Sequence, residues 1–252
     1  MFVRPTNSIS HRLARVAFIA ACVAAMIVAA AGPLHRYLDL DIEISIAVFR
    51  YGFYIAVAAV ALGLATIVPT RPGDRRRGFV AAFLAIVIGV AGAWMPVSWF
   101  LWSQQLPVIN DISSDISDPP AMVALLALRR GAPNPPAYPG AAVAVQQRAA
   151  YPDIAPIVLP VPPAEAFKRV DRVAMAMGWD VVTRAPTEGR LEAIDTSEWF
   201  GFRDDIVVRI RADGTGTGSR IDIRSKSRAG ESDLGVNARR IRNFIARLKA
   251  ET

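Results

Sequence analysis

Cysteine and histidine are nearly absent from this chain of 252 residues. The single cysteine, Cys22, excludes a disulfide within one chain and any metal site built from several thiolates. Both histidines, His11 and His35, precede residue 103, so the remainder can form neither a Ser-His-Asp triad nor a histidine-based zinc site. Phosphate-binding motifs of the Walker or G-x-G-x-x-G kind are missing too. The sequence therefore predicts no metal and no cofactor, and it leans against an enzyme.

Charged residues are missing from three long apolar stretches, at residues 16–34, 51–68 and 79–101. Each approaches the roughly 20 apolar residues that a helix needs to cross a bilayer. We expect spans at about residues 14–34, 46–68 and 79–101, so that residues 1–102 form a transmembrane region in the lipid bilayer. Alternatively, the first span is a cleaved secretory signal, because Arg12 and Arg15 precede an apolar run that ends in small residues.

Basic residues are distributed unevenly around these spans. Arginines gather before the first span and between the second and third, at residues 71–77, whereas the loop after the first span is mainly acidic. No Lys or Arg occurs between Arg77 and Arg129. The positive-inside rule then predicts a multi-pass protein of the bacterial inner membrane, with a cytoplasmic N-terminus and a periplasmic domain after the third span.

The net charge of +7 comes mostly from the membrane part. Residues 1–102 hold nine Arg and four acidic residues, whereas residues 103–252 hold twenty basic and eighteen acidic residues. The second part therefore lacks the clustered positive charge that is typical of nucleic-acid-binding domains. We expect no nucleic-acid partner.

Residues 103–162 are rich in proline. Eleven of the 18 prolines lie between Pro119 and Pro163. This composition predicts an extended segment, either draped over a folded domain or acting as a stiff spacer. Short helices are expected within it at about residues 121–130 and 141–150.

Residues 163–252 show the pattern of a compact domain. Apolar residues at helical spacing predict helices over 164–177 and 234–249, and Asp233 is placed to cap the second. The order α-β-β-β-β-α predicts an α+β, two-layer domain with a four-stranded antiparallel sheet and helices on one face. Glycine and proline turns separate the four expected strands, at residues 179–184, 190–195, 205–212 and 219–226.

The last two strands predict their own register. If Ala212 pairs with Ser219, Ile210 faces Ile221, and all the apolar residues of both strands share one face. The opposite face then carries charged residues. This is the pattern of a sheet that is buried on one side.

Two parts of the sequence are candidates for contact with a partner. The string Trp199-Phe200-Gly201-Phe202 predicts either an apolar lip that touches lipid, ligand or protein, or a turn whose rings plug the core. Arg228 lies in a turn before the last helix, where an anion could bind, although the carboxylate of Asp233 would compete for the same amides. The predicted contact residues are Trp199, Phe200, Phe202, Arg228 and Arg240.

A second set of residues is structural or forms a possible acidic site. The spacing after Asn110 resembles the start of a calcium loop, but Ile116 and Met122 stand where glycine and an acid are required. Carboxylates that cap turns are the preferred interpretation. Asp204 and Asp205 are neighbours on a strand and should point to opposite faces. The set comprises Asn110, Asp111, Asp195, Asp204, Asp205 and Asp233.

Several strings after residue 106 carry a family resemblance. They are Asn110-Asp111-Ile112-Ser113, Asp118-Pro119-Pro120, Tyr151-Pro152-Asp153-Ile154, Asp195-Thr196, Trp199-Phe200-Gly201-Phe202-x-Asp204-Asp205 and Ser227-Arg228-x-Gly230-x-Ser232-Asp233-Leu234-Gly235-x-Asn237-Ala238-x-Arg240-Ile241. In combination they resemble the bacterial domain-of-unknown-function 1499 family over about residues 106–249. The resemblance implies one domain, preceded by three spans as in some proteobacterial members. It implies no activity, substrate or catalytic residue.

The leading hypothesis is an inner-membrane protein whose periplasmic domain binds an envelope component: a lipid, a cell-wall component or a protein. One alternative is an envelope hydrolase that uses Asp111, Asp195, Asp204 or Asp205. Another is a structural anchor or assembly factor whose spans do the main work. Oligomeric state and ligand do not follow from the sequence.

Overall fold

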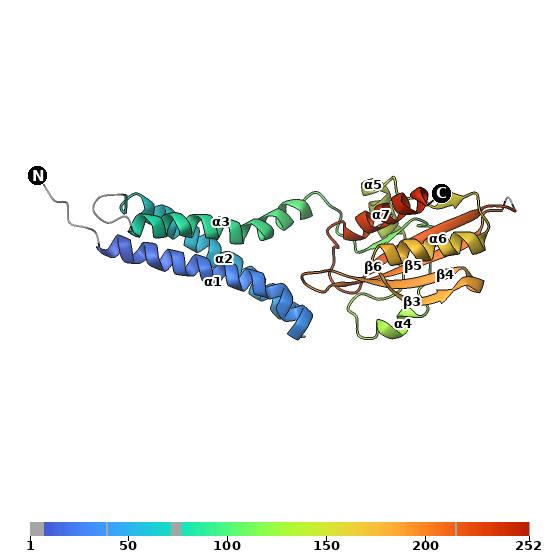
Figure 1. Ribbon diagram of the computed structural model, residues 1–252, viewed down its shortest axis with the longest axis horizontal. Helices are drawn as coiled ribbons and strands as arrows, with labels where there is room; N and C mark the ends of the chain where they lie inside the picture. Colours follow the sequence, from blue (N-terminus) through green and yellow to red (C-terminus); the bar gives the residue numbers. More distant parts are fainter. Residues whose placement is uncertain (1–7, 39, 72–76, 215, 252) are drawn as a thin grey trace, which may run out of the picture. The chain divides into compact units, whose positions relative to one another are not determined.

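The computed structural model describes residues 8–38, 40–71, 77–214 and 216–251 (Figure 1). Two compact units divide the chain. The first contains residues 1–102 and 198–201, and the second contains residues 103–197 and 202–252. Part of the charge pattern that predicts topology, at Arg4, Asp39, Arg75 and Arg76, lies outside the described residues.

The first unit contains three long helices, α1 (Ser8–Leu38), α2 (Ile42–Ile67) and α3 (Arg77–Ser103). All three are long and apolar enough to cross a membrane, as predicted. Small residues allow the helices to approach closely, as is common between membrane helices. A side-chain carbon added at Gly52 of α2, for example, would lie 2.9 Å from Val28 of α1. The alanines at the centre of this packing are Ala17, Ala21, Ala59 and Ala85.

The second unit is built on an antiparallel sheet. Its order is β1-β6-β5-β4-β3, and β2 also pairs with β6. The strands are β1 (Asp111–Ser113), β2 (Ile157–Leu159), β3 (Asp180–Ala185), β4 (Arg190–Thr196), β5 (Arg203–Ala212) and β6 (Ser219–Ser227). The sheet thus has six strands, and the prediction of four was wrong. The additional strands, β1 and β2, are three residues each, too short for an alternating pattern to show.

The predicted register of β5 and β6 is confirmed. Ala212 pairs with Ser219 and Ile210 with Ile221, and Arg209 pairs with Asp222 on the other face. The free edge of β6 is covered by β1 at one end and by β2 at the other. Covering the edge removes unpaired backbone groups that would otherwise invite association.

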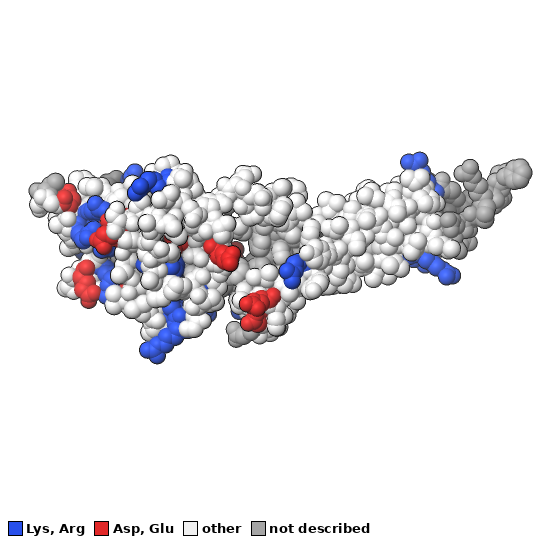
Figure 2. All heavy atoms as spheres, turned by 180° about the vertical axis from the view of Figure 1, so that it is seen from behind, with Lys and Arg blue, Asp and Glu red and all other residues white. Residues whose placement is uncertain are grey.

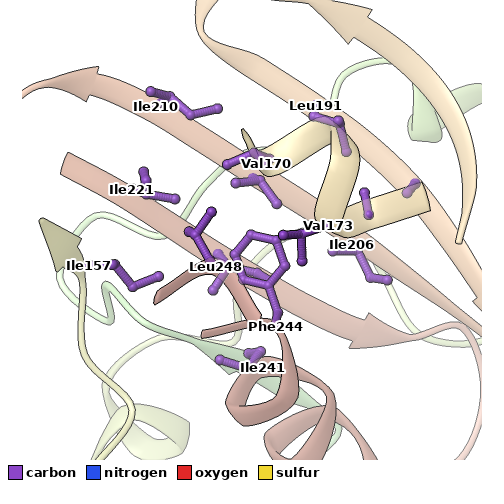
Figure 3. Packing of buried hydrophobic residues seen from close by; sticks show 14 of the residues in the cluster. Ile157, Val170, Val173, Leu191, Ile206, Ile210, Ile221, Ile241, Phe244 and Leu248 are labelled. Atoms are coloured by element: carbon purple, nitrogen blue, oxygen red, sulfur yellow. The ribbon is translucent and has the colours of Figure 1, made fainter. Parts of the chain in front are cut away.

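Two helices cover the apolar face of the sheet, as predicted. They are α6 (Pro163–Ala176) and α7 (Val236–Ala250). Phe244 of α7 lies at the centre of the core between Val173 of α6 and the sheet (Figure 3). Trp179 stacks on Phe244, with ring centroids 5.5 Å apart. Helix α5 (Ala141–Ala150) has the predicted bounds, and a short 3-10 turn, η1 (Pro186–Glu188), joins β3 to β4.

The charged face of the sheet is covered as well, by residues 114–138, which we call the strap. The strap contains a short helix, α4 (Leu125–Leu128), where a longer helix over 121–130 was expected. Met122 and Leu125 pack in one cluster with Ile194 and Val207 of the sheet. The prediction of helices on one face only was therefore wrong for α4. Charged residues dominate this face of β5 and β6, which made it look solvated.

Candidate functional site

The strap covers a layer of buried charges on the sheet. Asp111 faces Lys226 across β1 and β6, and Arg224 lies two residues along the same face. The Asp111 carboxylate accepts hydrogen bonds from Arg224 at 2.8 and 2.9 Å and from Lys226 Nζ at 2.9 Å. Burial lowers the pKa of Lys226 against the opposing effect of Asp111. The ring of Tyr138 lies 5.6 Å from the Arg224 guanidinium, and burial raises the Tyr138 pKa to about 12.

Two further clusters extend this layer. Asp205 of β5 is the cross-strand neighbour of Lys226 on the side away from β1. Its carboxylate forms ion pairs with Arg129 of the strap and with Arg228. Arg129 also donates to the Ser227 carbonyl of β6 at 3.4 Å, so its side chain ties the strap to the sheet. The second cluster gathers strap carboxylates and sheet arginines: Asp115, Asp118, Arg209, Arg211, Arg220 and Asp222.

On the other face of the sheet, the guanidinium of Arg240 is shared between two carboxylates. Asp195 and Asp204 stand directly opposite each other on β4 and β5, an unfavourable position for two like charges. Arg240 of α7 donates to both carboxylates, at 2.7 Å each. Burial acts to lower the pKa of Arg240, but the two carboxylates more than offset it and the pKa is raised. Asp204 and Asp205 point to opposite faces, as predicted.

Asp233 lies at the start of α7. Its carboxylate accepts from the backbone N–H of Gly235 at 2.8 Å and of Asn237 at 2.9 Å. The N-cap of α7 is Gly235, so the prediction of Asp233 as the N-cap was wrong: α7 begins at Val236, two residues later than predicted, and Asp233 reaches its first amides from outside the helix. Burial is the main cause that raises the pKa of Asp233. Asn110 directly precedes β1, and its side-chain amide donates to the Gly230 carbonyl at 2.7 Å.

A hollow of about 320 Å³ opens between the end of α6 and the outer side of α7. We call it the Trp179 hollow. Met177, Trp179 and Val236 form an apolar wall, and the Asp195–Arg240 pair lies in its lining. The remaining polar side chains come from α7 at intervals of four residues, so they share one side of the helix: Arg239, Asn243 and Arg247.

These arginines differ from their neighbours. Most arginines of the second unit pair with a carboxylate, even exposed ones such as Arg184 and Arg242. Within the described part of the chain, neither Arg239 nor Arg247 has a carboxylate partner, although Arg247 donates to the Ala176 carbonyl at 3.4 Å. The hollow therefore offers two guanidinium groups to an anion.

The comparison with protein families covers this same unit. A family model described as "Protein of unknown function (DUF1499)" matches residues 111–248, more than half of the chain. The chain belongs to this family. The match confirms the resemblance found in the sequence. It runs from the first residue of β1 into α7 and includes the strap. A search of the curated proteins finds no match.

The predicted contact residues do not form one site in the DUF1499 domain. Arg228 donates to both oxygens of Asp205, on the strap face, whereas Arg240 lies on the α7 face. Trp199 and Phe200 are in contact, with ring centroids 4.7 Å apart, and residues 198–201 group with the apolar helices. The Phe202 N–H donates to Ser197 Oγ at 2.9 Å. Contact of these residues with a partner stays a prediction.

The predicted acidic residues are brought into ion pairs or helix capping. Each of Asp111, Asp195, Asp204 and Asp205 pairs with at least one cation. Among the described residues, no group of three His, Cys, Asp or Glu is placed to hold a metal ion. Arg239, Asn243 and Arg247 are not among the residues predicted from the sequence, because they resemble any solvated helix face. Their spacing of four residues beside an aromatic residue is the only signal that could have found them.

Proposed function

We propose that this chain is a bacterial inner-membrane protein whose periplasmic DUF1499 domain binds an anionic envelope component in the Trp179 hollow. The observation that carries the proposal is the pair Arg239 and Arg247, which line one hollow without a carboxylate partner among the described residues. Hydrogen bonds between charged groups are the strongest of their kind, so two guanidinium groups without a carboxylate partner among the described residues favour a phosphate or carboxylate ligand.

The apolar wall of the hollow indicates that the ligand also has an apolar part. Met177, Trp179 and Val236 would contact a hydrocarbon portion next to the anionic group. Arg240 also lines the hollow, but Asp195 and Asp204 already neutralise it. Of the five contact residues predicted from the sequence, Arg240 is the one that lines the hollow. An anionic amphiphile fits this combination.

The short connection between α3 and β1 favours a ligand that is found in the membrane or close to it. Helix α3 ends at Ser103 and β1 begins at Asp111. A chain extends by at most about 3.6 Å per residue, so the connecting residues span no more than about 30 Å. A domain held this near a bilayer meets lipid headgroups at high effective concentration.

The test uses the full-length chain in a neutral detergent and three soluble probes. These are short-chain phosphatidylglycerol, short-chain phosphatidylcholine and inorganic phosphate. We expect phosphatidylglycerol to bind, and the double variant R239Q/R247Q to bind it at least about tenfold more weakly. Phosphate binding without a preference for the lipid would point to a free anion as ligand.

The matched control is R148Q/R203Q. Arg148 and Arg203 are also exposed, and within the described residues no carboxylate pairs with them. The control removes the same net charge from side chains that do not line the hollow, so we expect it to keep wild-type affinity. Equal affinity of both double variants, or no binding of any anionic probe, would contradict the proposal.

A further inference from the structure

The strap presents an apolar surface outward. Three large apolar residues within a stretch of six are exposed: Val123 by 53%, Leu126 by 46% and Leu128 by 50%. Arg130 follows them and is exposed. We call these four residues the α4 patch. Clustered exposure of large apolar side chains marks an interaction surface more often than single exposed residues do.

The patch is held from beneath by a buried carboxylate. Glu192 of β4 accepts hydrogen bonds from the backbone N–H groups of Val123, Ala124 and Leu125, at 2.8 to 3.2 Å. These are the groups that a helix leaves unpaired at its N-terminus. Arg190 pairs with the same carboxylate. The outward side chains are therefore fixed in place by the backbone beneath them.

Packing and ion pairs hold the strap on either side of the patch. Met122 and Leu125 point inward, to the cluster with Ile194 and Val207. Before the patch, the Pro120 carbonyl accepts from Arg224 at 3.2 Å. After it, Arg129 pairs with Asp205 and is itself buried. Met122, Leu125 and Arg129 are buried at helical spacing, so the large apolar residues between them remain on the outer side of the strap.

The charge of the segment indicates which partner fits. Residues 121–132 contain two arginines and no acidic residue. Arg129 is buried in an ion pair with Asp205, so Arg130 is the exposed cation of this segment. Apolar side chains beside a cation, without an acid, are the composition of segments that bind at the interface of anionic bilayers.

The chain itself brings such a bilayer near. Its three apolar helices are candidate spans, and the third ends eighteen residues before Ala121. We propose that the α4 patch docks on the surface of the membrane that holds these spans. Val123, Leu126 and Leu128 enter the boundary between headgroups and acyl chains, and Arg130 contacts lipid phosphates. This surface is separate from the Trp179 hollow and does not depend on its ligand.

The experiment measures lipid proximity of a single label. The full-length variant C22A/L126C is labelled with an environment-sensitive fluorophore and reconstituted in nanodiscs of phosphatidylglycerol and phosphatidylcholine. We expect a blue-shifted emission and quenching by lipids that carry a nitroxide near the headgroup. The matched control is C22A/V145C, because Val145 of α5 is 64% exposed and apolar in the same domain. We expect its emission to remain that of a probe in water.

Two further conditions separate the possible partners. Addition of R130Q, or nanodiscs of phosphatidylcholine alone, should reduce quenching at position 126 by about half or more, because each removes the attraction between the Arg130 cation and a net anionic headgroup. Equal solvent exposure at positions 126 and 145 would overturn the proposal. So would a shift at position 126 that appears without lipid quenching and grows with protein concentration, which would indicate a second copy as the partner.

Discussion

At the scale of single residues, Arg240 separates two carboxylates that otherwise face each other. Asp195 and Asp204 are cross-strand neighbours, and Asp204 is 6% exposed. Replacing Arg240 by Met keeps the volume of the stem but leaves both carboxylates without their cation. We expect R240M to lower the free energy of unfolding by about 3–5 kcal/mol, as for other broken buried ion pairs. A denaturant titration of the full-length chain in detergent measures the change.

The control for this variant lies on the same helix. Arg242 pairs with Asp153, and their side chains are 44% and 53% exposed. R242M has the same effect on helix propensity but breaks an exposed pair, so we expect a loss of less than about 1 kcal/mol. Similar stabilities of R240M and R242M would show that Arg240 has no structural role, and would return it to the predicted contact residues.

Asp233 gives the domain a pH dependence of unusual sign. Its pKa is raised above the ordinary value of 3.8 by burial. A carboxyl group with a higher pKa in the folded state binds its proton more tightly when folded, so its contribution to stability falls as pH rises through that pKa. Asn at this position cannot ionise. We expect the melting temperature of D233N, relative to wild type, to increase as pH rises above the ordinary pKa of 3.8.

Asp153 provides the opposite case. Its hydrogen bonds to Arg242 are the main cause that lowers its pKa. A lowered pKa contributes stability that is present above the ordinary pKa of 3.8 and is lost as pH falls through the lowered pKa. D153N should therefore lose stability relative to wild type as pH rises, by a small amount because the pair is exposed. The same slope in both variants would contradict the assigned burial of Asp233.

The sequence predicts only part of these residue roles. That Asp204 and Asp205 point apart follows from strand alternation alone. That Asp204 meets Arg240, and Asp205 meets Arg129 and Arg228, depends on how a helix and the strap cross the sheet. The partners are separated by 23 to 76 residues, and local spacing carries no information about such pairs.

At the scale of elements, the strap depends on a carboxylate in the sheet. Glu192 is 0% exposed and serves the amides at the start of α4. E192Q keeps the shape but replaces charged acceptors with one neutral oxygen, which weakens hydrogen bonds by about 1–3 kcal/mol in total. We expect hydrogen exchange at the amides of residues 123–125 to accelerate by about tenfold or more, while exchange in β5 and β6 remains slow.

Glu165 supplies the comparison. It lies in the first turn of α6, on the surface, where it pairs with Lys168 and Arg169 at 3.8 and 3.5 Å. E165Q removes one acidic charge without touching the strap, so exchange at residues 123–125 should not change. Unchanged exchange in E192Q as well would mean that packing of Met122 and Leu125 alone fixes α4, and would weaken the argument for a fixed patch.

Long elements of the domain were predictable, and short ones were not. The predicted strands of β5 and β6 and the helices α6 and α7 agree with the structure to within about two residues, because their apolar patterns are sustained. Strands β1 and β2 become strands only by pairing with β6. Gln147 shows the same limit: it looks like a solvated residue of α5, yet its amide completes the outer edge of β1 at Ser113.

At the scale of the whole molecule, charge is arranged differently in the two units. In the view of Figure 2, the helical unit shows charged residues mainly toward its ends, whereas blue and red are interspersed over the other unit. The interior of the DUF1499 domain continues this mixture, with Asp111, Asp205 and Asp222 each neutralised by two or three cations. The paired charges of the domain leave membrane orientation to the arginines that flank the spans.

Orientation is therefore the prediction on which a periplasmic ligand for the Trp179 hollow depends. Arginines before the first span and at residues 71–77 predict a cytoplasmic N-terminus and a periplasmic domain. Alkaline phosphatase fused after Thr252 should be active, and green fluorescent protein at the same position should be dark, because each reporter works on only one side of the membrane. Fusions after Arg71 should give the reverse. Exchanging the arginines of residues 71–77 for glutamine should mix the two orientations.

Fluorescence at Thr252 with the wild-type loop would place the domain in the cytoplasm. A periplasmic ligand for the Trp179 hollow would then be excluded, whereas the α4 patch could still meet the inner leaflet.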